Sequence, residues 1–358
     1  MIGANIIKVF IPAALAFASG IAFAPLLTHY LYAHKVWKKT ARKTALDGTV
    51  ATEFERLRET VHAGTETKTP RMGGILIWGT VAFVTILFWL LARATGLPVL
   101  TKLDFLSRSQ TWIPFFALLA GGVMGFFNDL LDVQPGGERG VRLRTRLLFV
   151  TFVSGFIGWW FYAKLGMVSI GIPADGTLHL GFLIVPLFII VSLGIYAGGV
   201  IDGIDGLSGG VFASIFMAYA GIAYFQNQVN LAAFCATLAG AILAFLWFNI
   251  PPARFWMTET GTMGLTMTLA AIAFMTDTLG GGYGIAALPI IAFLLVLTVV
   301  TNILQVLSKR FRGKKLFRIA PLHHHFEAIG WPSYKVTMRY WVVSVICAIL
   351  GMTLALLK

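Results

Sequence analysis

The chain is 358 residues long, 58% hydrophobic and 12% charged, with a formal net charge of +13. Soluble globular domains carry roughly 25% charged residues, so this composition excludes a water-soluble globule. We therefore expect a polytopic membrane protein. We do not interpret the positive charge as nucleic-acid binding, because basic residues of membrane proteins mark the cytoplasmic side.

Ten segments of the chain are apolar over a length close to the roughly 20 residues that a helix needs to cross the hydrocarbon core. Their apolar residues are continuous rather than alternating, which favours helices over membrane strands. We predict an all-α integral membrane fold with about ten transmembrane helices, organised as a single polytopic domain over residues 1–358. In chain order the predicted spans are 9–33, 72–92, 112–127, 147–163, 180–199, 207–225, 231–249, 262–276, 285–308 and 340–357.

Two connecting segments predict local structure of their own. Residues 51–62, in the first loop, have the pattern of a short amphipathic helix. Residues 167–173 and 177–180 alternate enough in polarity to predict a short β-hairpin between the fourth and fifth spans.

The charged residues divide unevenly between the two sides of this arrangement. The loops after the first, third, fifth, seventh and ninth spans hold 22 of the 28 Lys and Arg residues. Because cytoplasmic loops carry the excess of basic residues, we predict that these loops face the cytoplasm and that both termini face outward. The same loops hold 12 of the 15 Asp and Glu residues. Acidic residues contribute little to topology, so they indicate an active site at the cytoplasmic face.

The loops after the third and fifth spans contain paired carboxylates. Asp129 and Asp132 lie in the first of them, and Asp202 and Asp205 form an Asp-Gly-Ile-Asp-Gly sequence in the second. The glycines permit a tight turn that directs two carboxylates toward one point and lets a phosphate approach. The alternative is a pair of helix caps, in which Asp accepts backbone N–H bonds. Because the two Asp-Gly steps are in tandem without a basic neighbour, we favour a cation or phosphate site.

The loop after the seventh span adds a carboxylate and an aromatic side chain. Glu259 stands beside a glycine flanked by hydroxyl residues, and Trp256 precedes it. Trp256 has two interpretations. It is a residue of the interfacial aromatic belt, which is the commoner case, or it stacks on a planar base.

The loop after the ninth span contains His323, His324 and His325 behind a run of Lys and Arg residues. Three adjacent histidines are one sign of a metal site. Successive residues of a helix diverge by about 100°, however, so all three cannot easily ligate one ion. Hydrogen-bond donors to phosphate fit better. A patch for anionic lipids would explain the basic run but not the histidines.

Carboxylates from three loops, basic residues from two and histidines from one therefore gather on one predicted face. Carboxylates hold Mg²⁺ and basic side chains bind phosphates, so this set of groups is typical of phosphoryl transfer. Because many apolar helices surround these loops, we expect one substrate to be a lipid.

The loop sequences resemble the polyprenyl-phosphate N-acetylhexosamine-1-phosphate transferase superfamily, and within it the phospho-N-acetylmuramoyl-pentapeptide-transferase family. The resemblance spans the chain, with the motifs in the same loops and the same order. The histidine motif is the most specific and favours this family over the GlcNAc-phosphate branch. The motifs are Thr69-Pro70-Arg71-Met72-Gly73-Gly74, Asp202-Gly203-Ile204-Asp205-Gly206-Leu207 and Ala320-Pro321-Leu322-His323-His324-His325-Phe326-Glu327, with Gly330-Trp331.

This resemblance implies a reaction and its participants. UDP-N-acetylmuramoyl-pentapeptide and undecaprenyl phosphate would give undecaprenyl-diphospho-N-acetylmuramoyl-pentapeptide (lipid I) and UMP, with Mg²⁺ as cofactor. It also implies a multi-pass protein of the bacterial inner membrane that forms a homodimer, with no nucleic-acid partner.

The resemblance also implies roles for individual residues. Asp202 and Glu259 would lie at the metal and the diphosphate, and Asp129 would orient or deprotonate the lipid phosphate. His324 joins Asp129 and Asp202 in the implied catalytic set. The implied substrate-binding residues are Lys68, Arg71, Arg146, Asp205, Trp256 (on uracil), Gln305, His323 and His325.

Several positions depart from the family pattern, and they keep a catalytically impaired homologue open as an alternative. Asn128 replaces the first Asp of a pair, Asp132 and Arg146 replace lysines, Gly199 replaces an asparagine and Glu259 replaces an aspartate.

Two further alternatives are a transferase for UDP-GlcNAc or another UDP-sugar, and a membrane scaffold or transporter. The histidine motif argues against the first. The gathering of polar residues at one face, rather than at the bilayer midplane, argues against a transporter.

Overall fold

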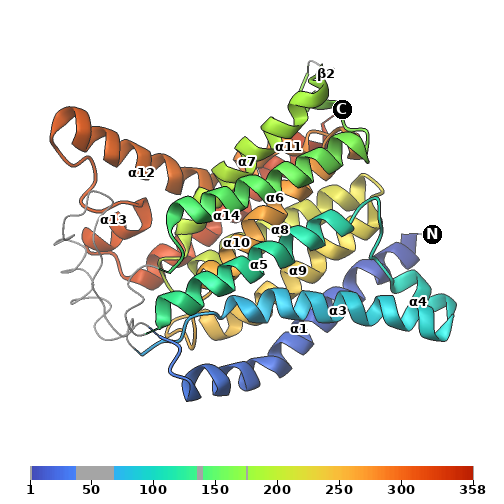
Figure 1. The fold of residues 1–358 in the computed structure, drawn as a ribbon, viewed down its shortest axis with the longest axis horizontal. Coiled ribbons are helices and arrows are strands. Elements are labelled where there is room, and N and C mark those ends of the chain that lie inside the picture. The colour runs from blue at the N-terminus through green and yellow to red at the C-terminus, as the bar shows by residue number, and fades with distance from the viewer. Residues whose placement is uncertain (1, 38–67, 135–139, 175, 358) are drawn as a thin grey trace.

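The computed structural model describes residues 2–37, 68–134, 140–174 and 176–357. They form a bundle of long helices (Figure 1). The expected amphipathic helix at 51–62 lies outside the described residues. The helices are α1 (Ile2–Ala33), α3 (Gly74–Thr95), α4 (Pro98–Leu103), α5 (Trp112–Val133), α6 (Leu143–Ala163), α7 (Ile184–Gly198), α8 (Leu207–Phe225), α9 (Val229–Asn249), α10 (Thr258–Met275), α11 (Gly284–Ile291), α12 (Phe293–Arg312), α13 (Leu322–Ala328) and α14 (Ser333–Leu356).

Within the described ranges, nine helices are long and apolar enough to cross a membrane. The all-α fold is therefore confirmed, and the protein is a multi-pass membrane protein. The nine spans are Asn5–Ala33, Gly74–Thr95, Trp112–Val133, Leu143–Ala163, Gly181–Ile201, Leu207–Phe225, Val229–Asn249, Phe293–Arg312 and Ser333–Leu356.

The tenth predicted span, 262–276, corresponds to α10, which is not among these nine. Every residue of α10 except Glu259 is buried inside the protein. A helix enclosed by other helices does not face lipid, so it can carry polar side chains that a lipid-facing helix cannot. The hydroxyls of Thr266 and Thr268 bond to carbonyls of their own helix, at 2.7 Å from Thr262 O and Gly264 O.

Helix α10 packs closely along α5 because glycines stand where the two helices approach. A Cβ atom on Gly121 of α5 would lie 2.7 Å from the carbonyl oxygen of Met263, and one on Gly264 of α10 would lie 2.8 Å from that of Leu118. Gly125 of α5 leaves no room for a Cβ against the backbone of Glu259. This packing brings the end of α5 to the beginning of α10.

The predicted β-hairpin is confirmed. Strand β1 (Ser169–Ile172) pairs antiparallel with β2 (Gly176–His179), with Ser169 opposite His179. Three 3₁₀ turns, at Gly181–Leu183, Gly199–Ile201 and Thr278–Gly280, complete the described elements.

Figure 1 shows β2 and both chain ends toward one end of the bundle and α13 at the other. That both termini face outward stays a prediction. The assignment of the α13 end to the cytoplasm follows from the charge distribution and stays a prediction.

Candidate active site

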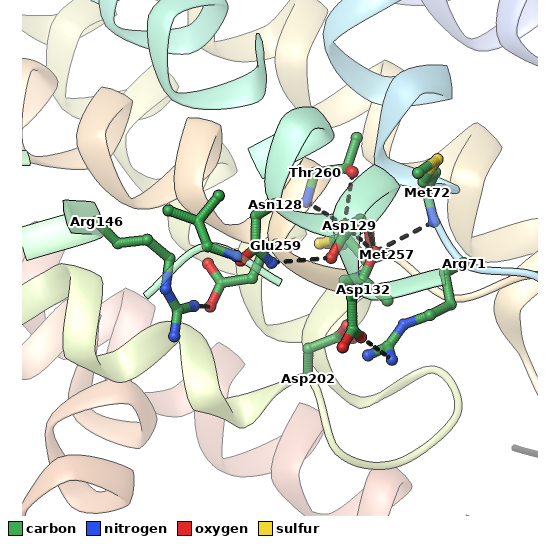
Figure 2. A network of polar contacts seen from close by, with 12 residues as sticks. Arg71, Met72, Asn128, Asp129, Asp132, Arg146, Asp202, Met257, Glu259 and Thr260 are labelled. Carbon is green, nitrogen blue, oxygen red and sulfur yellow. Dashed lines mark hydrogen bonds and ion pairs between the residues drawn. The ribbon is translucent and has the colours of Figure 1, made fainter. Parts of the chain in front are cut away.

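Three predicted site carboxylates meet around the first turn of α10. Asp129 comes from the last turns of α5, Asp202 from the segment between the 3₁₀ turn at Gly199–Ile201 and α8, and Glu259 from α10 itself. Figure 2 shows Asp129 and Glu259 close to this turn, with Asp202 beneath it. The sequence places these residues 57 or more positions apart, and the packing of α5 on α10 brings them together.

The Asp129 carboxylate is enclosed by protein donors and is 1% exposed. Its Oδ2 accepts the Thr260 N–H at 2.8 Å and the hydroxyls of Thr260 and Thr258 at 2.6 and 2.5 Å. Its Oδ1 accepts the Asn128 side-chain amide at 3.2 Å. Four donors therefore occupy this carboxylate, and it anchors the first turn of α10.

Asn128 supplies one of the four donors that hold Asp129. Its amide donates to Asp129, and its Oδ1 accepts the Val141 N–H at 3.0 Å. A second aspartate in place of Asn128 could not donate in this way while ionised. The departure from the family's Asp-Asp pair thus supplies a hydrogen-bond donor where a second negative charge would stand.

Asp202 is also bonded to α10. Its Oδ2 accepts the N–H of Thr258, the first residue of that helix, at 2.8 Å, and its Oδ1 accepts the Ser208 hydroxyl at 2.6 Å. Burial raises the pKa of this carboxyl, while the bonds from Ser208 and Thr258 and the nearby Arg71 charge act in the opposite direction. Asp129 and Asp202 therefore both accept N–H groups of the first turn of α10, a helix distant in sequence. The helix that directly follows the Asp-Gly pair, α8, begins at Gly206 without a side-chain cap.

Asp205 has different partners from Asp202, although the two are three residues apart. Its Oδ1 accepts the Trp256 indole N–H at 2.9 Å, and its Oδ2 accepts the Ala253 N–H at 3.0 Å. The expectation that the turn directs both carboxylates toward one point is therefore wrong for this structure. Asp202 faces α10, whereas Asp205 holds the segment that carries Trp256, whose indole is partly exposed.

Two ion pairs border the carboxylates. Arg71 Nη1 donates to Asp132 Oδ2 at 2.6 Å, and Arg146 of α6 pairs with Glu259 (Figure 2). Asp132 stands where the family has a lysine. Its negative charge holds Arg71, from the first loop, beside the site. Glu259 keeps 30% of its side chain exposed in spite of its pair. Lys68 is exposed and precedes Arg71 in the same loop.

The three histidines lie on α13; His323 and His324 both reach Gly203, whereas His325 bonds to Arg318. His323 is fully buried, and neither of its ring nitrogens has a hydrogen-bond partner within the described structure. His324 Nδ1 lies 2.8 Å from Glu327 Oε2. His325, less buried, accepts the Arg318 N–H at 3.2 Å. Burial lowers the pKa of His323 well below its ordinary value, so this imidazole is neutral at pH 7.

Helix α13 is packed against the Asp202–Asp205 turn at Gly203. A Cβ atom at this position would lie 2.7 Å from Nε2 of both His323 and His324. A side chain here would displace the two imidazoles, which therefore adjoin the residue next to Asp202. This contact brings the histidines of α13 next to the turn that carries Asp202 and Asp205.

Gln305, on α12, uses its amide to hold the segment that follows its own helix. Its Oε1 accepts the N–H groups of Leu316 and Phe317 at 3.0 and 2.9 Å, and its Nε2 donates to Phe317 O at 3.0 Å. The structure therefore gives this residue a supporting role between α12 and α13.

Sequence reasoning missed the hydroxyl and amide groups that orient the carboxylates. These residues are Asn128, Ser208, Thr258, Thr260 and Ser333. Thr258 and Thr260 were visible only as hydroxyl residues beside Glu259. Their partner Asp129 is about 130 positions away, so no local pattern could connect them.

Comparison of the sequence with known proteins identifies similar proteins. Residues 111–277 match the family described as Glycosyl transferase family 4. The chain is 32% identical over 289 residues to the phospho-N-acetylmuramoyl-pentapeptide-transferase of Geobacillus sp. (strain WCH70), which covers 80% of this chain and 83% of that protein. This chain belongs to the phospho-N-acetylmuramoyl-pentapeptide-transferase family. A family member from Levilactobacillus brevis is 31% identical over 295 residues, 81% of this chain and 85% of its own length.

Proposed function

We propose that this protein transfers phospho-N-acetylmuramoyl-pentapeptide from UDP-N-acetylmuramoyl-pentapeptide to undecaprenyl phosphate, forming lipid I and UMP in peptidoglycan synthesis. The observation that carries the proposal is the joining of three family motifs at one place, where α13 meets Gly203 and where Thr258 bonds both to Asp202 and to the N–H of Met72. We place this site at the cytoplasmic face of the bacterial inner membrane, on the basis of the basic residues in its loops.

In this reaction a lipid phosphate oxygen attacks the β-phosphorus of the UDP-sugar. The new bond joins the two phosphates of the product, and the bond between the α- and β-phosphates breaks to release UMP. A phosphate monoester is mostly ionised near pH 7, because its second pKa is about 6. The nucleophile therefore needs no strong base, which agrees with the four donors that already occupy Asp129.

Asp202 and Glu259 fit a Mg²⁺ ion that is shared with the substrate. Mg²⁺ is usually held by one or two carboxylates together with substrate phosphates rather than by a full protein cage. Within the described residues, no group of three or more His, Cys, Asp or Glu is placed to hold a metal ion. When bound, the ion would neutralise negative charge on the diphosphate.

The remaining predicted residues fit the anionic and planar parts of the donor. Arg71 and Arg146 each hold a guanidinium beside the carboxylates, and the Nε of each is buried without a partner in the described structure. We propose that both bind phosphate oxygens, with Lys68 nearby. Trp256, fixed through its indole N–H by Asp205, presents a ring on which uracil can stack.

One assay tests the proposal. Purified protein in detergent receives UDP-N-acetylmuramoyl-pentapeptide, undecaprenyl phosphate and Mg²⁺, and released UMP is measured. We expect release with this donor and its loss in Asp202→Asn. Release only with UDP-GlcNAc would replace the proposed donor, and no release with either donor would contradict a transferase.

A further inference from the structure

Glu327 is a buried carboxylate at the end of α13 that is hydrogen-bonded to His324 and Ser333. It is 3% exposed. Its Oε2 lies 2.8 Å from His324 Nδ1, and its Oε1 accepts the Ser333 hydroxyl at 2.6 Å. Ser333 is the first residue of α14, and the positive end of a helix dipole favours a carboxylate there.

These contacts determine which nitrogen of His324 faces the site. An ionised carboxylate only accepts hydrogen bonds, so Nδ1 of His324 carries a proton and donates it to Glu327. The other ring nitrogen, Nε2, adjoins Gly203, since a Cβ atom there would be 2.7 Å from it. His324 Nε2 is therefore aimed at the turn that contains Asp202.

His323 lies directly beside His324, so the orientation of the His324 ring matters. The rings of His323 and His324 have centroids 4.4 Å apart, and both Nε2 atoms converge on Gly203. His323 has no hydrogen-bond partner on either nitrogen within the described structure. A rotated His324 ring would lose the bond from Nδ1 to Glu327.

We propose that Glu327 is a positioning residue for the transfer reaction: it orients His324, with Ser333 as its support, so that Nε2 accepts a hydrogen bond from a hydroxyl of the nucleotide-sugar donor beside Asp202. This inference rests on the proposed function for its substrate. Its geometric part, a ring with Nδ1 at Glu327 and Nε2 at Gly203, stands on the contacts alone. Carboxylates that orient an active-site imidazole in this way determine its tautomer and its direction.

The kinetic test uses the full-length protein in detergent with both substrates. In Glu327→Gln we expect kcat to fall roughly 10- to 100-fold, the usual cost of removing a partner that orients a histidine, with KM for both substrates unchanged. Glu327→Asp keeps the carboxylate and should recover part of kcat. Ser333→Ala, which leaves the His324 bond in place, should lose less than Glu327→Gln.

The matched control is Asp104→Asn. Asp104 is a carboxylate after α4 that pairs with Arg93 at 3.2 Å and accepts the Leu106 N–H. It lies outside the site, and we expect this variant to keep the wild-type kcat. Wild-type kcat in Glu327→Gln, or equal losses in the Gln and Asp variants, would overturn the inference.

A second readout separates the inference from the proposed function. In protein labelled with ¹⁵N-histidine, the His324 signals, assigned with His324→Gln, should be those of an Nδ1-protonated ring and should change in Glu327→Gln. An unchanged His324 spectrum would overturn the inference even if the enzyme is active. If the wild type releases no UMP while the spectrum behaves as expected, the proposed function fails and the Glu327–His324 geometry holds.

Discussion

Carboxylates stand at both ends of α10, and they differ in their partners. At the end of α10, Asp277 is 0% exposed and accepts two backbone N–H groups, from Gly171 at 2.7 Å and Ile285 at 2.9 Å. These bonds tie the β-hairpin and α11 to α10. At the beginning of α10, Glu259 bonds to an arginine and Asp202 bonds to a hydroxyl and to the first N–H of the helix.

The comparison shows that burial of an acid in a membrane protein does not identify its function. Ionisable groups inside membrane proteins are costly and usually functional, yet Asp277 has the partners of a structural group. Backbone donors cannot move away without unfolding a segment, whereas hydroxyl and guanidinium donors can change partners when a substrate arrives. Asp129, at the beginning of α10 but enclosed by four donors, is intermediate between the two cases.

The largest expected effect is that of Asp202→Asn, which removes a charge from the beginning of α10. We expect kcat to fall about 100- to 1000-fold, the range for loss of one group that stabilises developing charge. The melting temperature should stay near the wild-type value, because the Asn side-chain oxygen can still accept the Thr258 N–H. UMP release and thermal unfolding in detergent measure the two quantities. A variant with wild-type kcat would remove Asp202 from the site.

Asp129→Asn should lower both activity and stability. The amide has one acceptor oxygen for the four donors around Asp129, and its NH₂ group would face one of them. We expect a loss of about 1–3 kcal/mol of stability. We also expect a roughly 100-fold lower kcat from displacement of Glu259, since small misplacements of reacting groups carry that cost. If kcat falls while the melting temperature is unchanged, Asp129 acts on the substrate directly and is not an anchor.

Asp277→Asn tests the other end of the helix. One backbone N–H would lose its acceptor, which costs about 1–3 kcal/mol when it is buried. The melting temperature should fall, and kcat per folded molecule should match the wild type. A selective loss of kcat would mean that this carboxylate also serves the reaction, and the contrast between the two ends would then not hold.

The smallest expected effect concerns pH and His323. Because burial lowers the pKa of this imidazole in the folded protein, the unfolded chain binds a proton below about pH 6.5 that the folded protein does not. His323 therefore destabilises the fold as pH falls through this value, by at most about 1.4 kcal/mol per pH unit. The melting temperature of wild type should fall more steeply between pH 7 and pH 5 than that of His323→Gln. Parallel curves would show that His323 is not neutral when folded.

Much of the fold was predictable because a bilayer imposes a length and an apolar composition on each span. Eight of the predicted spans and the hairpin of β1 and β2 are present. The predicted span 285–308 is divided between α11 and α12, and the candidate span there is Phe293–Arg312. The tenth span, α10, was placed correctly as a helix, but its enclosure by other helices was not visible. Its threonines make the helix polar. The close packing against α5 at Gly121 and Gly264 helps to enclose the helix and keeps these threonines away from lipid.

The sequence by itself determined the membrane class, the motif order and the identity of the acids and histidines, because these follow from composition and from short local patterns. Only the tertiary structure decided which of these residues share a site and with what partners. It separated Asp202 from Asp205, paired Asp132 with Arg71, and set Glu327 behind His324. The physical reason is that hydrogen bonds depend on distances of about 3 Å, and helix packing fixes such distances between residues that are far apart in the chain.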